Sequence, residues 1–191
     1  MRLRWMWLVS ILWLTVPALA QSAGKELALT YDWMRGNAPV GGCGCFSLNG
    51  GSASLAWQLN PRLALAAEAG ATRASSQDLT LATYMAGPRL RLLSPERESR
   101  SRLAPFTQLL LGGAHASGAL AGTAGHSSNA FAFRAGGGLD VPLHGALTLR
   151  VIQADYLLTR IPNQVNDRQN IVQLGAGLVY RFGGSRSHSD R

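Results

Sequence analysis

The feature that most constrains this chain is an alternation of apolar and polar side chains that recurs in eight segments of about ten residues. In residues 171–182, Leu178 and Tyr180 share one face, whereas Gln173 and Gly175 share the other. Successive side chains of a β-strand point to opposite faces, so each segment is expected to be a strand. The other seven segments are residues 26–34, 49–59, 63–73, 80–93, 105–116, 130–141 and 146–160. The pattern predicts an all-β fold of eight antiparallel strands.

Two segments depart from simple alternation. In residues 105–116, the run Leu109 to Leu111 is consecutive and hides the phase. In residues 146–160, the apolar positions change phase between Val151 and Ile152. A β-bulge adds one residue to a strand and would produce such a change. We therefore expect a bulge near Val151.

The first twenty residues have the layout of a cleaved secretory signal. Arg2 and Arg4 precede an uncharged, mostly apolar run that ends in Ala18-Leu19-Ala20. This run is short for a transmembrane helix, which needs about 20 residues. We expect a signal peptide over residues 1–20, a barrel over 21–183 and a polar tail over 184–191.

The connections between the segments differ in length. No later stretch is long and apolar enough for a spanning helix, so a membrane-bound form of this chain must be a closed barrel. Long connections are expected at residues 35–48, 118–129 and 161–170. Short turns are expected at Asn60-Pro61-Arg62 and 142–145, which gives the outer-membrane pattern with long loops outside. Two connections break this pattern: residues 74–79 are short for an outer loop, and residues 94–104 are long for a periplasmic turn. The charged part of the second, Glu96 to Arg102, is expected to be a solvated turn.

The charged residues of the segments lie opposite their larger apolar side chains. They are Asp32, Glu68, Arg89, Arg91, Arg134, Asp140, Arg150, Asp155 and Arg181. Alternation alone would also fit a soluble barrel with an apolar interior. In a membrane barrel of eight strands the interior is just wide enough for side chains, so the charges would fill it as a polar plug. We then expect Asp140 to lie close to Arg150, and Arg134 to approach Asp155.

The last segment favours the membrane barrel. It resembles the β-signal by which outer-membrane barrels are recognised for assembly, on Gln173, Gly175, Leu178, Tyr180 and Phe182. The stretches 136–141, 149–160 and 177–183, and more weakly 86–89 and 105–106, resemble small outer-membrane β-barrel proteins of the OmpA-like porin superfamily, most of all acidobacterial-type versions. The resemblance implies an eight-stranded up-and-down transmembrane β-barrel and the barrel-assembly machinery as a partner. It implies no substrate.

Few residues suggest chemistry. Cys43 and Cys45 are the only cysteines, and in an oxidising compartment they could form a small disulfide, remain free thiols or share a metal with another group. Two thiolates do not complete a tetrahedral zinc site. His115, His144 and His188 form no ligand motif, so no metal or cofactor is expected.

Residues 126–130 resemble the active-site stretch of outer-membrane lipid A deacylases. A serine hydrolase using His126 and Ser128 needs an acid to orient the histidine. Asp140 lies at the far end of the same segment, roughly 40 Å away in an extended strand, and is too distant. Asp78 and Asp167 would be the remaining candidates.

Three functions remain open from the sequence. The first is a non-enzymatic outer-membrane protein whose loops contact the envelope or partners, and the others are a narrow porin for small solutes and a lipid A-modifying hydrolase. Without Arg2 and Arg4, 16 basic and 10 acidic residues remain, dispersed along the chain. Export and this dispersal exclude nucleic acid and favour outer-membrane lipids, lipopolysaccharide included. Ligand, conductance, oligomeric state and cysteine redox state stay open.

Overall fold

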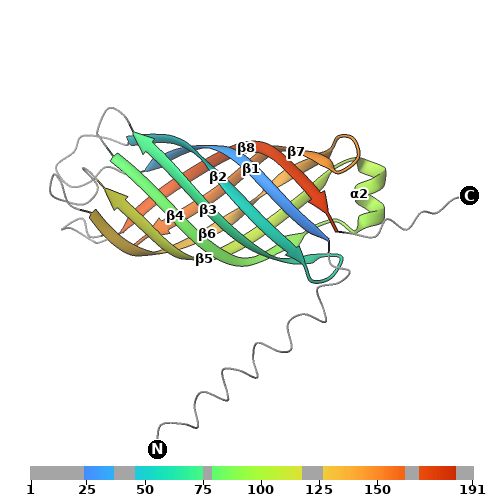
Figure 1. Ribbon diagram of the computed structural model, residues 1–191, viewed down its shortest axis with the longest axis horizontal. Coiled ribbons are helices and arrows are strands. Elements are labelled where there is room, and N and C mark those ends of the chain that lie inside the picture. Colours follow the sequence, from blue (N-terminus) through green and yellow to red (C-terminus); the bar gives the residue numbers. More distant parts are fainter. Residues whose placement is uncertain (1–23, 37–45, 75–78, 118–126, 162–167, 184–191) are drawn as a thin grey trace, which may run out of the picture.

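The computed structural model describes residues 24–36, 46–74, 79–117, 127–161 and 168–183, and in these ranges eight antiparallel strands form a closed barrel (Figure 1). Each strand pairs with its neighbours in sequence, and β1 (Lys25–Gly36) closes the barrel against β8 (Gln169–Phe182). The remaining strands are β2 (Phe46–Gln58), β3 (Leu63–Ala74), β4 (Leu79–Arg91), β5 (Ala104–Ser117), β6 (Ser127–Pro142) and β7 (Leu147–Thr159). The prediction of an eight-stranded up-and-down barrel is confirmed, with each strand boundary within three residues of the expected one.

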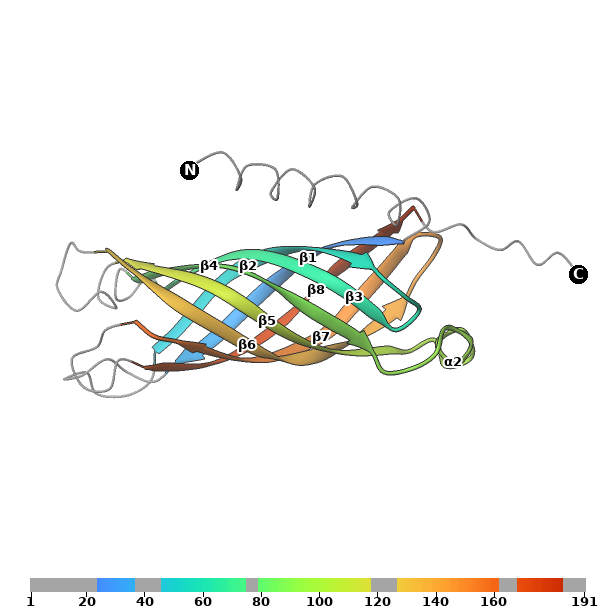
Figure 2. The ribbon, with the colours of Figure 1, turned by 90° about the horizontal axis from the view of Figure 1, so that it is seen from below.

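The two ends of the barrel differ (Figures 1 and 2). At one end, called here the turn end, β1 begins, β8 finishes and the connections β2–β3, β4–β5 and β6–β7 lie. At the other, called here the loop end, the connections consist mostly of residues outside the described ranges. This is the arrangement that the alternating connection lengths predict.

Local chemistry explains the two tight turns. The Asn60 carboxamide oxygen accepts hydrogen bonds from the backbone N–H groups of Arg62 and Leu63, at 2.9 and 2.8 Å. Such an Asx turn reverses the chain between β2 and β3. Between β6 and β7, Gly145 adopts φ +63°, a conformation that glycine reaches without steric cost.

The segment after β4 is a helix and not the expected turn, although its described arginines are exposed to solvent as expected. Residues Pro95–Ser101 form a short helix, α2, with proline in its first turn. It finishes at Arg102, which takes a left-handed conformation and donates its backbone N–H to the Glu98 carbonyl. Glu98 is buried whereas Arg97 and Arg100 are exposed, so α2 packs one side against the turn end and presents the other to solvent. No helix in the described part of the chain is long and apolar enough to cross a membrane.

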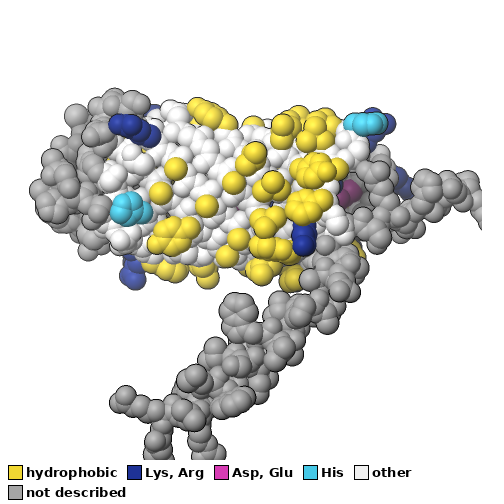
Figure 3. All heavy atoms as spheres, in the orientation of Figure 1, with side chains coloured by type: hydrophobic (Ala, Val, Ile, Leu, Met, Phe, Trp, Pro, Cys, Tyr) yellow, Lys and Arg dark blue, Asp and Glu magenta, His cyan; other side chains and the backbone are white. Residues whose placement is uncertain are grey.

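The outer face of the barrel is apolar. Leu29, Tyr31, Tyr84, Leu111 and Phe131 are each more than half exposed. Apolar side chains spread over the outer surface seen in Figure 3. The charged residues of the strands that lie opposite them are mostly buried, which reverses the arrangement of a soluble barrel. The expected orientation, with the apolar face on the outside of the barrel, is confirmed.

The structure shows which side chains face outward in β7 and β5, the two segments whose sequences depart from simple alternation. Val151 and Ile152 are both 46% exposed, and the pairing of β7 with β8 shifts between Arg150 and Gln153. The predicted bulge is therefore present. In β5, Leu109 and Leu111 face outward and Leu110 is fully buried.

Candidate functional site

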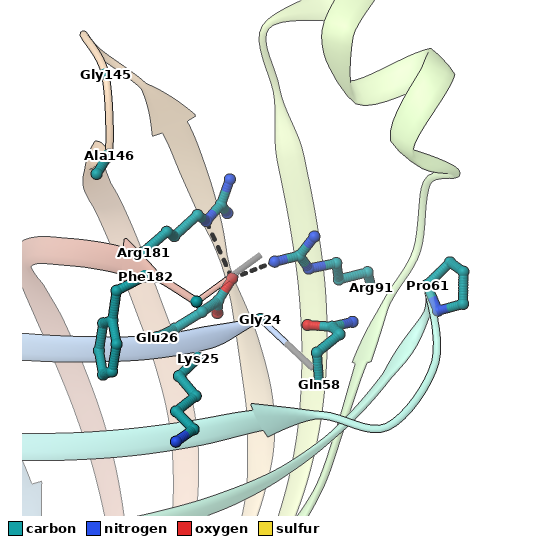
Figure 4. Close-up of a pocket in the computed structure, with 11 residues that line it drawn as sticks. Gly24, Lys25, Glu26, Gln58, Pro61, Arg91, Gly145, Ala146, Arg181 and Phe182 are labelled. Carbon is teal, nitrogen blue, oxygen red and sulfur yellow. Dashed lines mark hydrogen bonds and ion pairs between the residues drawn. The ribbon is translucent and has the colours of Figure 1, made fainter. Parts of the chain in front are cut away.

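The barrel interior opens at the turn end into a mouth cavity of about 400 Å³ (Figure 4). Glu26 of β1 projects into it, accepts a hydrogen bond from Arg91 of β4 and forms an ion pair with Arg181 of β8, whose Nε lies 3.0 Å from the carboxylate. Lys25 and Gln58 line the same cavity. The barrel's closure creates this cluster, because β4 contributes a side chain from across the mouth to the seam between β1 and β8.

Helix α2 adds a second carboxylate to the mouth. One oxygen of Glu98 lies 3.8 Å from an Arg91 nitrogen, and the side chain is 8% exposed. Burial raises the pKa of the Glu98 carboxyl, and the positive charge of Arg91 opposes that rise. Glu98 is thus held in a place that favours its neutral form more than water does.

Deeper in the lumen, Arg150 is the centre of a hydrogen-bonded network. Its guanidinium donates two hydrogen bonds to the Asp140 carboxylate, at 2.8 and 3.1 Å, and one to the Gln153 side-chain oxygen at 2.9 Å. Its guanidinium also lies 4.4 Å from the Phe106 ring centroid, and that of Arg89 lies 5.0 Å from the same ring. Both the ion pair and the cation–π contacts are desolvated, which strengthens them.

Asp155 joins this network through amides. Gln108 donates to it at 3.2 Å and Gln153 at 2.6 Å, while Gln108 accepts from Arg89 at 2.9 Å. The expected approach of Arg134 to Asp155 is wrong as a direct pair. Arg134 instead binds Glu68, which projects from β3.

Two glycines in the barrel wall leave room for the carboxylates of Asp155 and Asp32. A side-chain carbon added at Gly136 would lie 2.2 Å from an Asp155 oxygen, and one added at Gly175 would lie 2.6 Å from an Asp32 oxygen. Such distances are far below van der Waals contact. Glycine therefore allows Asp155 to lie against the barrel wall, within reach of the two glutamines instead of Arg134.

Toward the loop end the interior becomes apolar. A tightly packed layer replaces the charges there, and its larger members are Met34, Phe46, Leu48, Leu79, Leu81, Leu110, Leu157, Ile161 and Ile171. Each of them is at most 3% exposed. The expected polar plug is therefore correct for the turn-end half and wrong for the loop-end half. Most interior positions there carry apolar residues, although Thr72, Thr159 and Gln169 are also buried at this end.

The structure brings together most of the charged residues that the sequence places in the lumen. Asp140 and Arg150 form one pair, and Arg91 and Arg181 share a carboxylate. That carboxylate belongs to Glu26, which sequence reasoning missed. Glu26 lies on the same face of β1 as Ala28 and Thr30, so the phase of the strand already places it inside.

The other candidates do not form a site in the described residues. Cys43, Cys45 and His126 lie outside the described ranges. Asn129 bonds to a His115 ring nitrogen at 2.8 Å on the outer face, and Asp140 is bound to Arg150 near the opposite end. Asp140 thus cannot serve a hydrolase built on Ser128, as its sequence position predicts.

The residues of the β-signal-like pattern lie on both faces of β8. Leu178, Tyr180 and Phe182 are exposed on the outer surface, and the rings of Tyr180 and Phe182 stack with centroids 6.0 Å apart. Gln173 is buried inside, and Gly175 faces Asp32. Residues 171–182 of the strand pair with β1, so these residues lie at the closing seam.

Solved structures of small outer-membrane barrels share this fold. Neisserial surface protein A superposes with a TM-score of 0.61 at 16% identity, over 83% of this chain and 97% of that one. Ail, the attachment invasion locus protein of Yersinia pestis, gives 0.55 at 15% identity, over 84% and 99%, in a complex with the heparin analogue sucrose octasulfate. The N-terminal β-barrel domain of Pseudomonas aeruginosa OprF gives 0.50 at 14% identity, over 85% and 98%.

No protein-family model matches the sequence, and no curated protein matches it. At identities of 14–16% the structural likeness establishes the fold and nothing about ligands. The chain has the fold of a small outer-membrane β-barrel, as the resemblance in its last third implies.

Proposed function

We propose that this protein is a non-enzymatic barrel of a bacterial outer membrane that anchors its exposed loops at the cell surface. The N-terminal signal layout, the apolar outer face and the likeness to outer-membrane barrels support this location. In this orientation the turn end faces the periplasm and the loop end faces outward. Outer-membrane lipids and the barrel-assembly machinery are then its obligatory partners.

The observation that carries the proposal is the filled lumen. Most interior side chains from the mouth to the loop end bond to one another or pack in the apolar layer, and Leu48, Leu110 and Arg150 are at most 1% exposed. The carboxamides of Gln169 and Gln173 are also fully buried, without a hydrogen-bond partner among the described residues. A solute crossing the barrel would have to displace both a charged network and an apolar layer. The protein is therefore better suited to presenting loops than to conducting solutes.

Charge balance in the lumen supports the same conclusion. The inward-facing strand residues in the described ranges include five carboxylates, Glu26, Asp32, Glu68, Asp140 and Asp155. They also include five guanidiniums, Arg89, Arg91, Arg134, Arg150 and Arg181. The formal charges of these ten residues sum to zero, so the interior does not concentrate ions of one sign as a charged selectivity ring does.

Planar-bilayer recording tests the proposal. Purified protein should give no steady single-channel steps under conditions in which a general porin conducts. A triple variant, Leu81→Ser, Leu110→Ser and Leu157→Ser, should admit water into the apolar layer, and its folding is checked by heat-dependent migration on SDS gels. Steady conductance of the unaltered protein would refute the anchoring proposal.

A narrow channel is the second candidate, because the mouth cavity already admits solutes of modest size at the turn end. It predicts conductance that depends on Arg91 and Arg181 at the mouth. The same recordings separate it from the anchor.

Unchanged lipid A masses in cells that overproduce the protein would in turn be expected of a non-enzymatic barrel.

A further inference from the structure

The charges of this barrel are segregated between inside and outside. Every carboxylate whose side chain the structure describes is buried, namely Glu26, Asp32, Glu68, Glu98, Asp140 and Asp155. Exposed arginines project outward near the loop end instead, at Arg35, Arg73, Arg160 and Arg168. Figure 3 shows dark blue side chains of this kind beside the loop-end residues. In the described residues, the charged side chains on the outer surface of the loop end are therefore arginines, of which Arg73 and Arg168 also interact within the chain.

The height of these arginines relative to a bilayer follows from β8. Its outward face runs from Tyr180 at the turn end to Asn170, whose carboxamide accepts a hydrogen bond from Tyr156 at 2.6 Å. Ten steps of about 3.3 Å, tilted by about 40°, span roughly 25 Å, which matches the apolar band of an outer-membrane barrel. Arg168 lies two residues beyond Asn170 and so reaches the headgroup level of the outer leaflet.

Two of the arginines border one cavity at this level. Its volume is about 360 Å³, and Phe131, Leu158, Arg160 and Arg168 line it. The backbone N–H of Arg160 donates to the Phe131 carbonyl at 3.0 Å, which fixes the arginine to the end of β6. Phe131 is 53% exposed, so the cavity has an apolar wall next to two guanidiniums.

We propose that this cavity binds a phosphate group of lipid A in the outer leaflet, with Arg160 and Arg168 as phosphate ligands. Planar guanidiniums bind phosphate through paired charge-assisted hydrogen bonds. Phe131 and Leu158 contact the upper part of an acyl chain, as apolar residues do at the headgroup boundary. A lone soluble phosphate does not need this apolar wall, whereas an acylated phosphate uses both parts. The inference rests on the proposed outer-membrane location.

The test uses the full mature protein in phosphatidylcholine nanodiscs, with binding measured by native mass spectrometry. The probes are diphosphoryl lipid A, fully dephosphorylated lipid A and phosphatidylglycerol. The variant is Arg160→Gln with Arg168→Gln. Its matched control is Arg62→Gln with Arg100→Gln, which removes the same charge from exposed positions at the turn end.

The variant should bind diphosphoryl lipid A about tenfold or more weakly, since each charge-assisted hydrogen bond contributes on the order of one such factor. The control should bind as the unaltered protein does, and dephosphorylated lipid A and phosphatidylglycerol should bind weakly to all three. An equal loss in the control, unchanged binding by the variant, or equal binding of either comparison lipid would overturn the proposal. Conductance, measured separately, reports on the anchoring function and does not depend on this cavity.

Discussion

Removing the Arg150 side chain should destabilise the barrel more than removing any exposed arginine. The change deletes two hydrogen bonds to Asp140, one to Gln153 and the cation–π contact with Phe106. It also leaves the Asp140 carboxylate unpaired at 3% exposure. Breaking one side of a buried ion pair costs about 3–5 kcal/mol, and we expect Arg150→Ala and Asp140→Ala each to lose about 3–4 kcal/mol.

The double variant should lose about 2 kcal/mol less than the sum of the two, because the charge-assisted bonds between the residues are then counted once. Urea unfolding in lipid vesicles, followed by the fluorescence of Trp33 and Trp57, measures the three free energies. The exposed hydrogen bond of Arg35 to Ser47, 3.2 Å long, provides a control cycle with a coupling below about 1 kcal/mol. Strictly additive losses for Asp140 and Arg150 would refute the desolvated lumen network.

Four further outcomes follow from the same structure. Gly136→Ala should destabilise the barrel by about 1–3 kcal/mol in the same unfolding assay, because the added carbon overlaps Asp155 and the opposite backbone. Replacing Tyr180 and Phe182 with aspartate should reduce membrane insertion and leave export intact, since both rings lie on the lipid-facing side of the closing strand; normal insertion in a fractionation assay would argue against an assembly role. Unboiled protein should migrate differently from boiled protein on SDS gels, because every strand is bonded to two neighbours. The raised pKa of Glu98 means that the folded state binds its proton more readily than the unfolded state, so this residue's contribution to stability should increase as the pH falls through that raised pKa; protection of the α2 amides from hydrogen exchange, relative to their intrinsic rates at each pH, should rise accordingly, and Glu98→Gln should remove that rise.

The alternation of polar and apolar residues along the sequence predicted much of the fold. The number of strands, their boundaries and the lipid-facing side follow from period two, because the two faces of a membrane strand meet different solvents. The bulge at Val151 and Ile152 was predictable for the same reason, since one extra residue exchanges the faces of everything after it. Glu26 could have been placed inside by that rule as well.

The interior pairs needed the closed barrel. The sequence alone determined that Arg134 and Asp155 face the lumen, because the alternation of polar and apolar residues within each of their strands marks the inward face. It could not determine that Arg134 binds Glu68, since closure decides which distant strands face each other across the interior. Likewise, Leu110 and Leu111 are chemically identical, and only the register of β5 between β4 and β6 sends the first into the apolar layer and the second to the lipid-facing surface. Side-chain chemistry fixed which residues belong in the strands, and three-dimensional closure fixed which of them meet.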